Sequence, residues 1–333
     1  MSRRCRVCIC TTLLFVIASL QPSQAYLRLS DLNGSQRVFF TWANGRIPYF
    51  VSDQPVPGVS VDALEAALQR ATSNWQAAPG STMTFEYQGR TSARPLVVDG
   101  RNTIGFLSHP ELEGVLGVTA TIIDSVSGEV VESDMFFNSA VDWSVAGNGE
   151  EDRFDLESIA LHELGHMLGL NHSALGYFEV TAGAARLAAA EAVMFPFAFD
   201  PGTIAGRQLK ADDIAGAAEI YPDAGHRADT GAIRAHVQLE GRNAFGVHVM
   251  AFNPISGEMV AGFVLENGDA LITGLSPGPY LLRVEPVDDD AVSSYFDEPP
   301  VVDLGFRNAF VDRLVNVQRG ATAGPVEITL VAR

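Results

Sequence analysis

The sequence predicts an α+β domain followed by an all-β sandwich domain, and three patterns support this division. Up to about residue 223, short β-branched runs alternate with two segments of helical spacing. The stretch 224–230 is polar and rich in turn formers, as expected of a linker. From 231 to 333, short apolar runs separated by Gly and Pro follow one another, which is typical of a β-sandwich. With 333 residues, 47% of them hydrophobic, the chain is long enough to form two cores.

In the first domain the helices have clearer signals than the strands. Ser60 is a suitable N-cap for a helix to about Ala77, with apolar residues at helical spacing and Trp75 expected in the core. Asp155 caps a second helix, which Gly169 ends because glycine readily takes the left-handed conformation. The alanine-rich segment 182–192 favours another helix. The expected strands are 38–42, 47–51, 83–87, 97–106, 115–123 and 134–138.

The N-terminus has the pattern of a secretory signal peptide at 1–25. Three arginines precede an apolar run at 7–20, and Ser23-Gln24-Ala25 supplies the small residues that a signal peptidase recognises. The run is too short to span a membrane, so we expect a secreted, extracellular protein with no membrane association after the signal is removed. All three cysteines fall within 1–25, so the mature chain has no disulfide. Segment 26–36 is then an N-terminal arm or a short pro-segment.

The formal net charge of −18 argues against nucleic acid as a partner, because nucleic-acid binding requires clustered Lys and Arg. Removing the arginines of the signal peptide makes the mature chain more acidic still. We expect a monomer.

The second helix carries the residues around which the chain is organised. His162 and His166 are four positions apart and lie about 40° apart on one helical face, where both can bind one metal ion. Gly169 lets the chain turn back, which brings His172 to the metal as a third ligand. Glu163 is badly placed as a ligand but well placed as a general base for a zinc-bound water. An isolated His-Glu-x-x-His is often only a solvated helix face; Gly169 and His172 at fixed offsets argue against a chance match.

This motif is the metzincin signature, and Ser173 after the third histidine resembles the matrixin, or matrix-metalloproteinase-like, branch. Val193-Met194-Phe195-Pro196 resembles the Met-turn of that family, and 209–221 resembles its final helix. The resemblance covers about 37–223. It implies an α+β metzincin catalytic domain with a twisted mixed sheet, an active-site helix and a C-terminal helix. It also implies that Met194 supports the zinc site without binding the metal.

The resemblance indicates where a substrate binds. Segment 115–123 corresponds to the edge strand above the cleft, which would hold an extended peptide by main-chain pairing around Gly117 and Val118. Gly117 lets a substrate backbone approach closely, although a bulge explains this glycine as well. Phe195 and Phe197 are expected beside an apolar pocket. The long segment between the zinc motif and Met194 either shapes specificity or is a surface elaboration.

Two departures from the matrixins of animals narrow the prediction. Those proteins hold a second, structural zinc with three histidines and an aspartate, whereas His109 is the only histidine here before residue 162; we therefore expect one zinc. Their latency through a propeptide cysteine is excluded because no cysteine survives. Calcium is possible. The carboxylates that would bind it, or that are simply solvated loop charges, are Asp124, Glu129, Glu132 and Asp134.

The second domain carries no catalytic constellation. Segment 268–280 resembles a carboxypeptidase-regulatory or prealbumin-like module, which implies an accessory β-sandwich. The expected strands are 233–239, 247–252, 259–264, 270–273, 280–284 and 326–331.

These features predict a zinc metalloendopeptidase, a secreted hydrolase that cleaves peptide bonds in extracellular proteins, including those of the extracellular matrix. One alternative is a secreted adhesion or matrix-binding protein with a vestigial metallo-domain, against which the intact Glu163 and three histidines argue. Another is a zinc enzyme acting on something other than protein.

Overall fold

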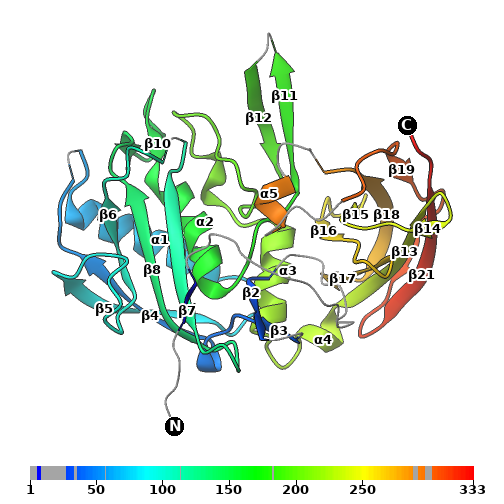
Figure 1. Ribbon diagram of the computed structural model, residues 1–333, viewed down its shortest axis with the longest axis horizontal. Helices are drawn as coiled ribbons and strands as arrows, with labels where there is room; N and C mark the ends of the chain where they lie inside the picture. The colour runs from blue at the N-terminus through cyan, green and yellow to red at the C-terminus, as the bar shows by residue number, and fades with distance from the viewer. Residues whose placement is uncertain are drawn as a thin grey trace.

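The computed structural model describes residues 6–8, 28–33, 36–56, 58–112, 114–181, 184–287, 292–296 and 302–333. Most of the predicted signal peptide therefore lies outside the described residues. Two bodies lie side by side in Figure 1, a mixed sheet with helices and a β-sandwich, as the sequence predicts. Within the described part of the chain, no helix combines the length and apolar character needed to cross a bilayer.

The first domain is built on one mixed sheet in the strand order β1-β7-β8-β6-β4-β5. Strands β4, β5, β6 and β8 run parallel to one another, whereas β7 is antiparallel to β8. The first strand pairs with Thr121–Ile123 of β7. The bounds are β1 Arg6–Cys8, β4 Arg46–Ser52, β5 Thr84–Thr91, β6 Thr103–Leu107, β7 Gly117–Ile123 and β8 Val130–Asn138.

Two helices pack together against this sheet, and the sequence predicted both. Helix α1 (Val61–Gln76) is capped by the Ser60 side chain, and α2 (Leu156–Leu168) by Asp155. Trp75 is fully buried, and its indole N–H donates to the Leu161 carbonyl at 2.8 Å. This bond fixes α1 against the active-site helix. The remaining short elements of this domain are β2 Ser30–Asn33, β3 Gln36–Phe39, η1 Ala43–Gly45, β9 Trp143–Ser144, β10 Phe154–Asp155, η2 Ala205–Arg207 and α3 Ala211–Ile220.

The predicted helix at 182–192 is wrong. Within it, residues 184–190 form β12 (Ala184–Ala190), which pairs with β11 (Gly176–Thr181) in an antiparallel hairpin. The hairpin projects from the body of the molecule in Figure 1. The helix propensity of alanine is a weak, local preference, and pairing with a neighbouring strand that is rich in aromatic and β-branched residues overrides it.

Segment 28–39 supports the end of α2. Strands β2 and β3 form an antiparallel hairpin, and the Leu29 N–H donates to the Gly169 carbonyl at 2.9 Å. Helix α4 (His226–Asp229) lies within the polar segment 224–230. The buried His226 is 3.0 Å from a carboxylate oxygen of Glu219. This segment is therefore folded onto the first domain.

The second domain is a sandwich of two sheets, one ordered β14-β13-β17 with β21 beside β13, the other β16-β15-β18-β19 with β20 beside β18. Each of the six strands predicted here from the sequence is present. The bounds are β13 Gly231–Leu239, β14 Arg242–Asn243, β15 His248–Phe252, β16 Met259–Phe263, β17 Asp269–Leu275, β18 Gly278–Glu285, α5 Val292–Tyr295, β19 Ala309–Phe310, β20 Val315–Val317 and β21 Thr322–Leu330.

The two domains share a continuous apolar core. Ala215 of α3 and Leu275 of β17 belong to the same buried cluster. A Cβ at Gly274 would lie 2.9 Å from the Ala215 side chain, so the backbone of β17 packs directly on α3. Interfaces of this closeness leave little room for independent domain motion.

Candidate metal centre and active site

Helix α2 places two histidines on one face and apolar residues on the other. The Asp155 carboxylate accepts the Ser158 N–H at 2.9 Å, which satisfies one of the free amides at the start of the helix. Leu161, Leu164 and Leu168 are buried in the core. Gly169 has φ 109°, a left-handed conformation, and turns the chain toward His172 as the sequence predicts.

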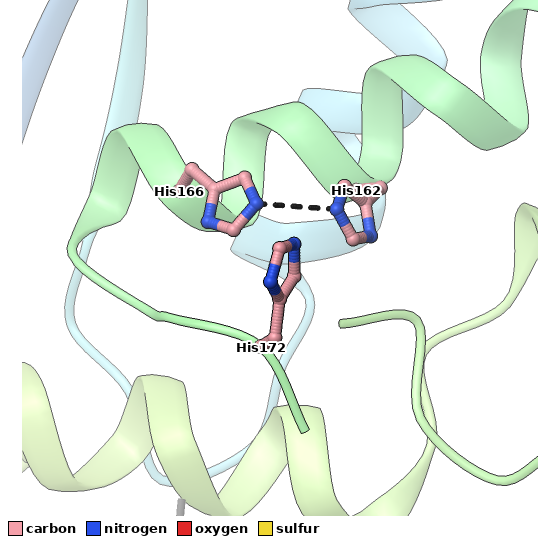
Figure 2. Close-up of side chains that lie close together, drawn as sticks. All are labelled: His162, His166 and His172. Carbon is pink, nitrogen blue, oxygen red and sulfur yellow. Dashed lines mark hydrogen bonds between the residues drawn. The ribbon is translucent and has the colours of Figure 1, made fainter. Parts of the chain in front are cut away.

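The three histidines converge on one point (Figure 2). The Nε2 atoms of His162 and His166 are 3.1 Å apart, and ligand atoms of all three residues lie within 4.8 Å of one another. The centroid of the His172 ring is 5.4 Å from that of His162 and 4.8 Å from that of His166. One metal ion can therefore bind all three.

The outward ring nitrogens of the three histidines fix which nitrogen carries the proton. The Nδ1–H groups of His162, His166 and His172 donate to backbone carbonyls at 2.7, 2.9 and 2.8 Å, respectively. These acceptors are the carbonyls of Val193, Leu170 and Ser294. Because each Nδ1 holds the proton, the Nε2 lone pairs face one another, which is the arrangement that a metal ion requires of its ligands.

Burial keeps these imidazoles neutral. Desolvation, reinforced by the neighbouring His172, lowers the pKa of His162 to about 3. The pKa of His166 also falls well below its usual value, and that of His172 is lowered, in both cases chiefly by burial. Three neutral nitrogen donors are the protein ligands of many catalytic zinc sites, and the residues present fit that ion.

Glu163 lies buried beside the histidines. Burial raises the pKa of its carboxyl to about 7, and the hydroxyl of Thr119, which donates to Oε2 at 2.7 Å, opposes that rise. A Cβ on Gly117 would lie 2.9 Å from Glu163 Oε1. The absence of a side chain at Gly117 therefore makes room for the carboxylate. The register of β7 shifts between Ile122 and Ile123, so no bulge occurs at Gly117.

Met194 packs against α2 at Gly165, the residue before His166. It is almost fully buried, and a Cβ on Gly165 of α2 would overlap its sulfur. Asp213 holds this turn because its carboxylate accepts the Val193 and Met194 N–H groups at 2.8 and 3.1 Å. The Val193 carbonyl is also the acceptor for His162. The turn at Val193 and Met194 thereby connects α3 to the candidate metal ligand His162.

Comparison with known families agrees with this geometry. The family profile described as Matrixin (Peptidase_M10) matches residues 41–222, more than half of the chain. The chain belongs to the matrixin family. Membership implies a zinc-metallopeptidase domain, which the histidine cluster fits.

Two solved structures share slight similarity with this matrixin. One is the crystal structure of GBS52, the minor pilin in the gram-positive pathogen Streptococcus agalactiae, at 14% identity and TM-score 0.22, covering 32% of this chain and 45% of that one. The other is the Bacillus anthracis TIE protein, at 15% identity and TM-score 0.21, covering 31% of this chain and 17% of that one. The chain spans less than half the length of either protein, and the likeness is too slight to bear on function.

The substrate-contact residues predicted for the matrixin fall in different environments. Gly117 adjoins Glu163, and Val118 follows it in β7, paired with Phe136 of β8. Phe195 is buried, and a Cβ on Gly176 at the base of the hairpin would overlap its ring. Phe197 is 38% exposed, with its ring 5.7 Å from that of Phe195. Gly117 therefore lies in contact with the candidate base Glu163.

Three of the four carboxylates that the sequence offers for calcium in this matrixin, Asp124, Glu132 and Asp134, accept hydrogen bonds from backbone amides. Asp124 accepts the amides of its own turn, from Val126 at 3.0 Å and Ser127 at 3.1 Å. Glu132 accepts the Gly100 N–H at 2.6 Å. Asp134 accepts the Leu96 and Thr103 N–H groups at 2.6 and 2.7 Å, and its burial raises its pKa to about 7. Glu132 and Asp134 thus anchor the loop between β5 and β6.

Sequence reasoning missed several residues that support the site of this matrixin. Thr119 has a weak signal, since it is one of two threonines in the mainly apolar strand β7. Gly165 has a clearer one, since a glycine inside a helix costs about 1 kcal/mol and usually marks a close approach. The Ser294 carbonyl has no signal in the sequence, because every residue carries a backbone carbonyl.

Proposed function

We propose that this matrixin is a secreted zinc-dependent endopeptidase that hydrolyses peptide bonds in extracellular proteins, with Glu163 as general base. The observation that carries the proposal is the convergence of three neutral histidines (Figure 2), together with Glu163, the residue next to His162 in α2, which is a buried carboxylate of raised pKa. A pKa near 7 suits a group that must accept and return a proton at neutral pH.

When bound by His162, His166 and His172, zinc supplies Lewis acidity, which polarises a peptide carbonyl and lowers the pKa of a water molecule. Glu163 accepts the proton of the attacking water and passes it to the leaving nitrogen. Thr119 holds the carboxylate through its hydroxyl. Strand β1 pairs with β7 only at Thr121–Ile123, and an extended substrate pairs with the other half of β7, near Gly117 and Val118. Met194 supports the site from below without binding the metal.

The proposal includes the organisation predicted from the sequence. It comprises a signal peptide at 1–25, an N-terminal arm at 26–36, a metallopeptidase domain at 37–223, a linker at 224–230 and an accessory sandwich at 231–333. The accessory module resembles the carboxypeptidase-regulatory, or prealbumin-like, type. The proposal also includes a monomeric state, one zinc per chain, and an apolar pocket beside Phe195 and Phe197. Calcium binding stays a prediction. The carboxylates of Glu132 and Asp134 accept hydrogen bonds from backbone N–H groups, which gives the prediction no support.

The alternative is a secreted adhesion protein in which the metallo-domain is vestigial. A vestigial site has no need to keep a buried, uncompensated carboxylate, because burying a charge costs stability. Glu163 is 5% exposed, and its carboxylate accepts a hydrogen bond from the neutral hydroxyl of Thr119. That arrangement favours the enzyme.

The test is cleavage of casein by the purified mature protein, with and without a chelator, alongside Glu163→Ala. We expect one zinc per chain in both proteins, cleavage that the chelator abolishes, and a loss of at least about 10²-fold in Glu163→Ala. Full activity in Glu163→Ala would contradict the role of the base. A wild-type protein without bound zinc would contradict the metal centre, and bound zinc without proteolysis would favour the adhesion protein.

A further inference from the structure

The loop that carries the third histidine is held by the second domain. Residues His172, Ser173, Ala174 and Leu175 are consecutive, and each contacts the sandwich domain directly or through one intervening side chain. No other part of the described metal centre is so closely tied to the second domain.

His172 bonds to α5 of the second domain. Its Nδ1–H donates to the Ser294 carbonyl at 2.8 Å, across 122 residues of sequence. In contrast, His162 and His166 use acceptors from the first domain. Helix α5 lies between the two bodies in Figure 1. The ring orientation of the third ligand therefore depends on a segment of the sandwich domain.

Ser173 is connected to the sandwich through Asp212 of α3. The Ser173 hydroxyl donates to one carboxylate oxygen at 2.7 Å, and the Ala261 N–H of β16 donates to the other at 2.9 Å. Both Ser173 and Asp212 are buried. Losing either donor would leave a buried acceptor unsatisfied, so the bridge holds the loop and β16 together.

Apolar contacts hold the next two residues. Ala174 packs against a cluster that contains Val292 and Tyr295 of α5. Leu175 is fully buried in a second cluster with Met250 and Ala261 of the sandwich. The loop is thus fixed on both faces by the same domain.

We propose that the β-sandwich domain is an integral part of the metal centre, in which Ser294 and Asp212 act as positioning residues for His172. This inference rests on the proposed function, since it assumes that the histidines bind zinc. Docking of the sandwich and binding of zinc are then thermodynamically coupled, and each strengthens the other by the same factor. The second domain serves as a fixed wall of the site rather than as a tethered binding module.

The first experiment measures hydrogen exchange of the full-length Glu163→Ala protein, which keeps all three ligands and does not digest itself. Zinc should slow exchange at least about threefold in peptides covering α5 and β16, as well as in the 162–172 segment. A peptide from β21 is the internal control and should be unchanged. Protection confined to 162–172 would overturn the inference while leaving the zinc site intact.

The second experiment compares matched valine truncations in the same background. Val292 of α5 and Val315 of β20 are equally buried, with 7% and 8% of their surface exposed. Val292→Ala loosens α5, whereas Val315→Ala removes the same two methyl groups from β20. Competition with a chelator at fixed pH should give a zinc dissociation constant at least about threefold higher for Val292→Ala and unchanged for Val315→Ala. Tyr295→Ala, which removes the larger anchor of α5, should raise it about tenfold or more.

The outcomes separate the two proposals. Equal zinc affinity in Val292→Ala, Tyr295→Ala and Val315→Ala overturns the coupling, whereas graded weakening supports it. A wild-type protein that binds no zinc overturns the proposed function, and the coupling with it. If Tyr295→Ala does not fold, the comparison of Val292→Ala with Val315→Ala and the hydrogen-exchange measurement still show whether zinc binding is coupled to the sandwich domain.

Discussion

An alanine at Gly117 is expected to impair catalysis while sparing the zinc site. Its Cβ would lie 2.9 Å from both Cγ and Oε1 of Glu163, whereas ordinary contacts begin near 3.4 Å. The Glu163 side chain must therefore move by about half an ångström. Because it is the flexible end of a side chain, the move costs little stability. Misplacing a reacting group by 1 Å can cost about 10²-fold in rate, so we expect kcat to fall about tenfold, or about 1.4 kcal/mol.

The assay is steady-state cleavage of a quenched peptide, with zinc content and the urea midpoint measured on the same samples. Gly147→Ala is the matched control, since no atom lies within 4 Å of a Cβ there and its φ is unremarkable. The control should match the wild type in every measurement. Wild-type kcat in Gly117→Ala would refute the steric argument, and a parallel loss of zinc would show that the ligands moved instead.

Three further predictions concern the carboxylates. Thr119→Val removes the hydroxyl that lowers the Glu163 pKa, so the acidic limb of the kcat/KM profile should move to higher pH, whereas Thr119→Ser should not shift it. Asp213→Ala leaves three backbone amides without their acceptor and should lower the free energy of unfolding by about 3 kcal/mol or more, measured in urea. Burial raises the pKa of the Asp212 carboxyl to about 7, so the folded state holds the carboxyl proton more tightly than the unfolded chain does. The stability that this proton contributes is complete below about pH 4 and is lost as pH rises toward 7. Asp212→Asn, which mimics the protonated group, should flatten this dependence by at most about 4 kcal/mol in urea titrations of the metal-free protein.

The metal-binding helix was predictable because its determinants are local. Asp155, the repeating leucines and Gly169 specify its start, buried face and end within 15 residues, and the structure agrees at each point. The strands of the sandwich were predictable for the same reason, since alternation and turn residues mark them individually. Their order in the two sheets was not, because it depends on pairing between distant segments.

The segment 182–192 shows how a local preference fails. Its alanines favour helix by a few tenths of a kcal/mol per residue, and this is less than an adjacent strand provides through pairing. The signal that competed was the alternation in 176–181, which became β11. A helix there would have left β11 without a partner, because the structure pairs it with β12 alone among the described strands.

The hydrogen bonds that orient the three histidines could not be predicted from the sequence, and the reason is chemical. All three Nδ1 acceptors are backbone carbonyls, at Val193, Leu170 and Ser294, and the side chains at these positions do not make the bond. Residue type therefore carries no information about them, and substitution at the acceptor position leaves the carbonyl in place. What can be altered is the packing that positions each carbonyl. For His172 that packing belongs to the sandwich domain, so the function of the second domain is tested most directly at the zinc site, and not by seeking a binding partner for its surface.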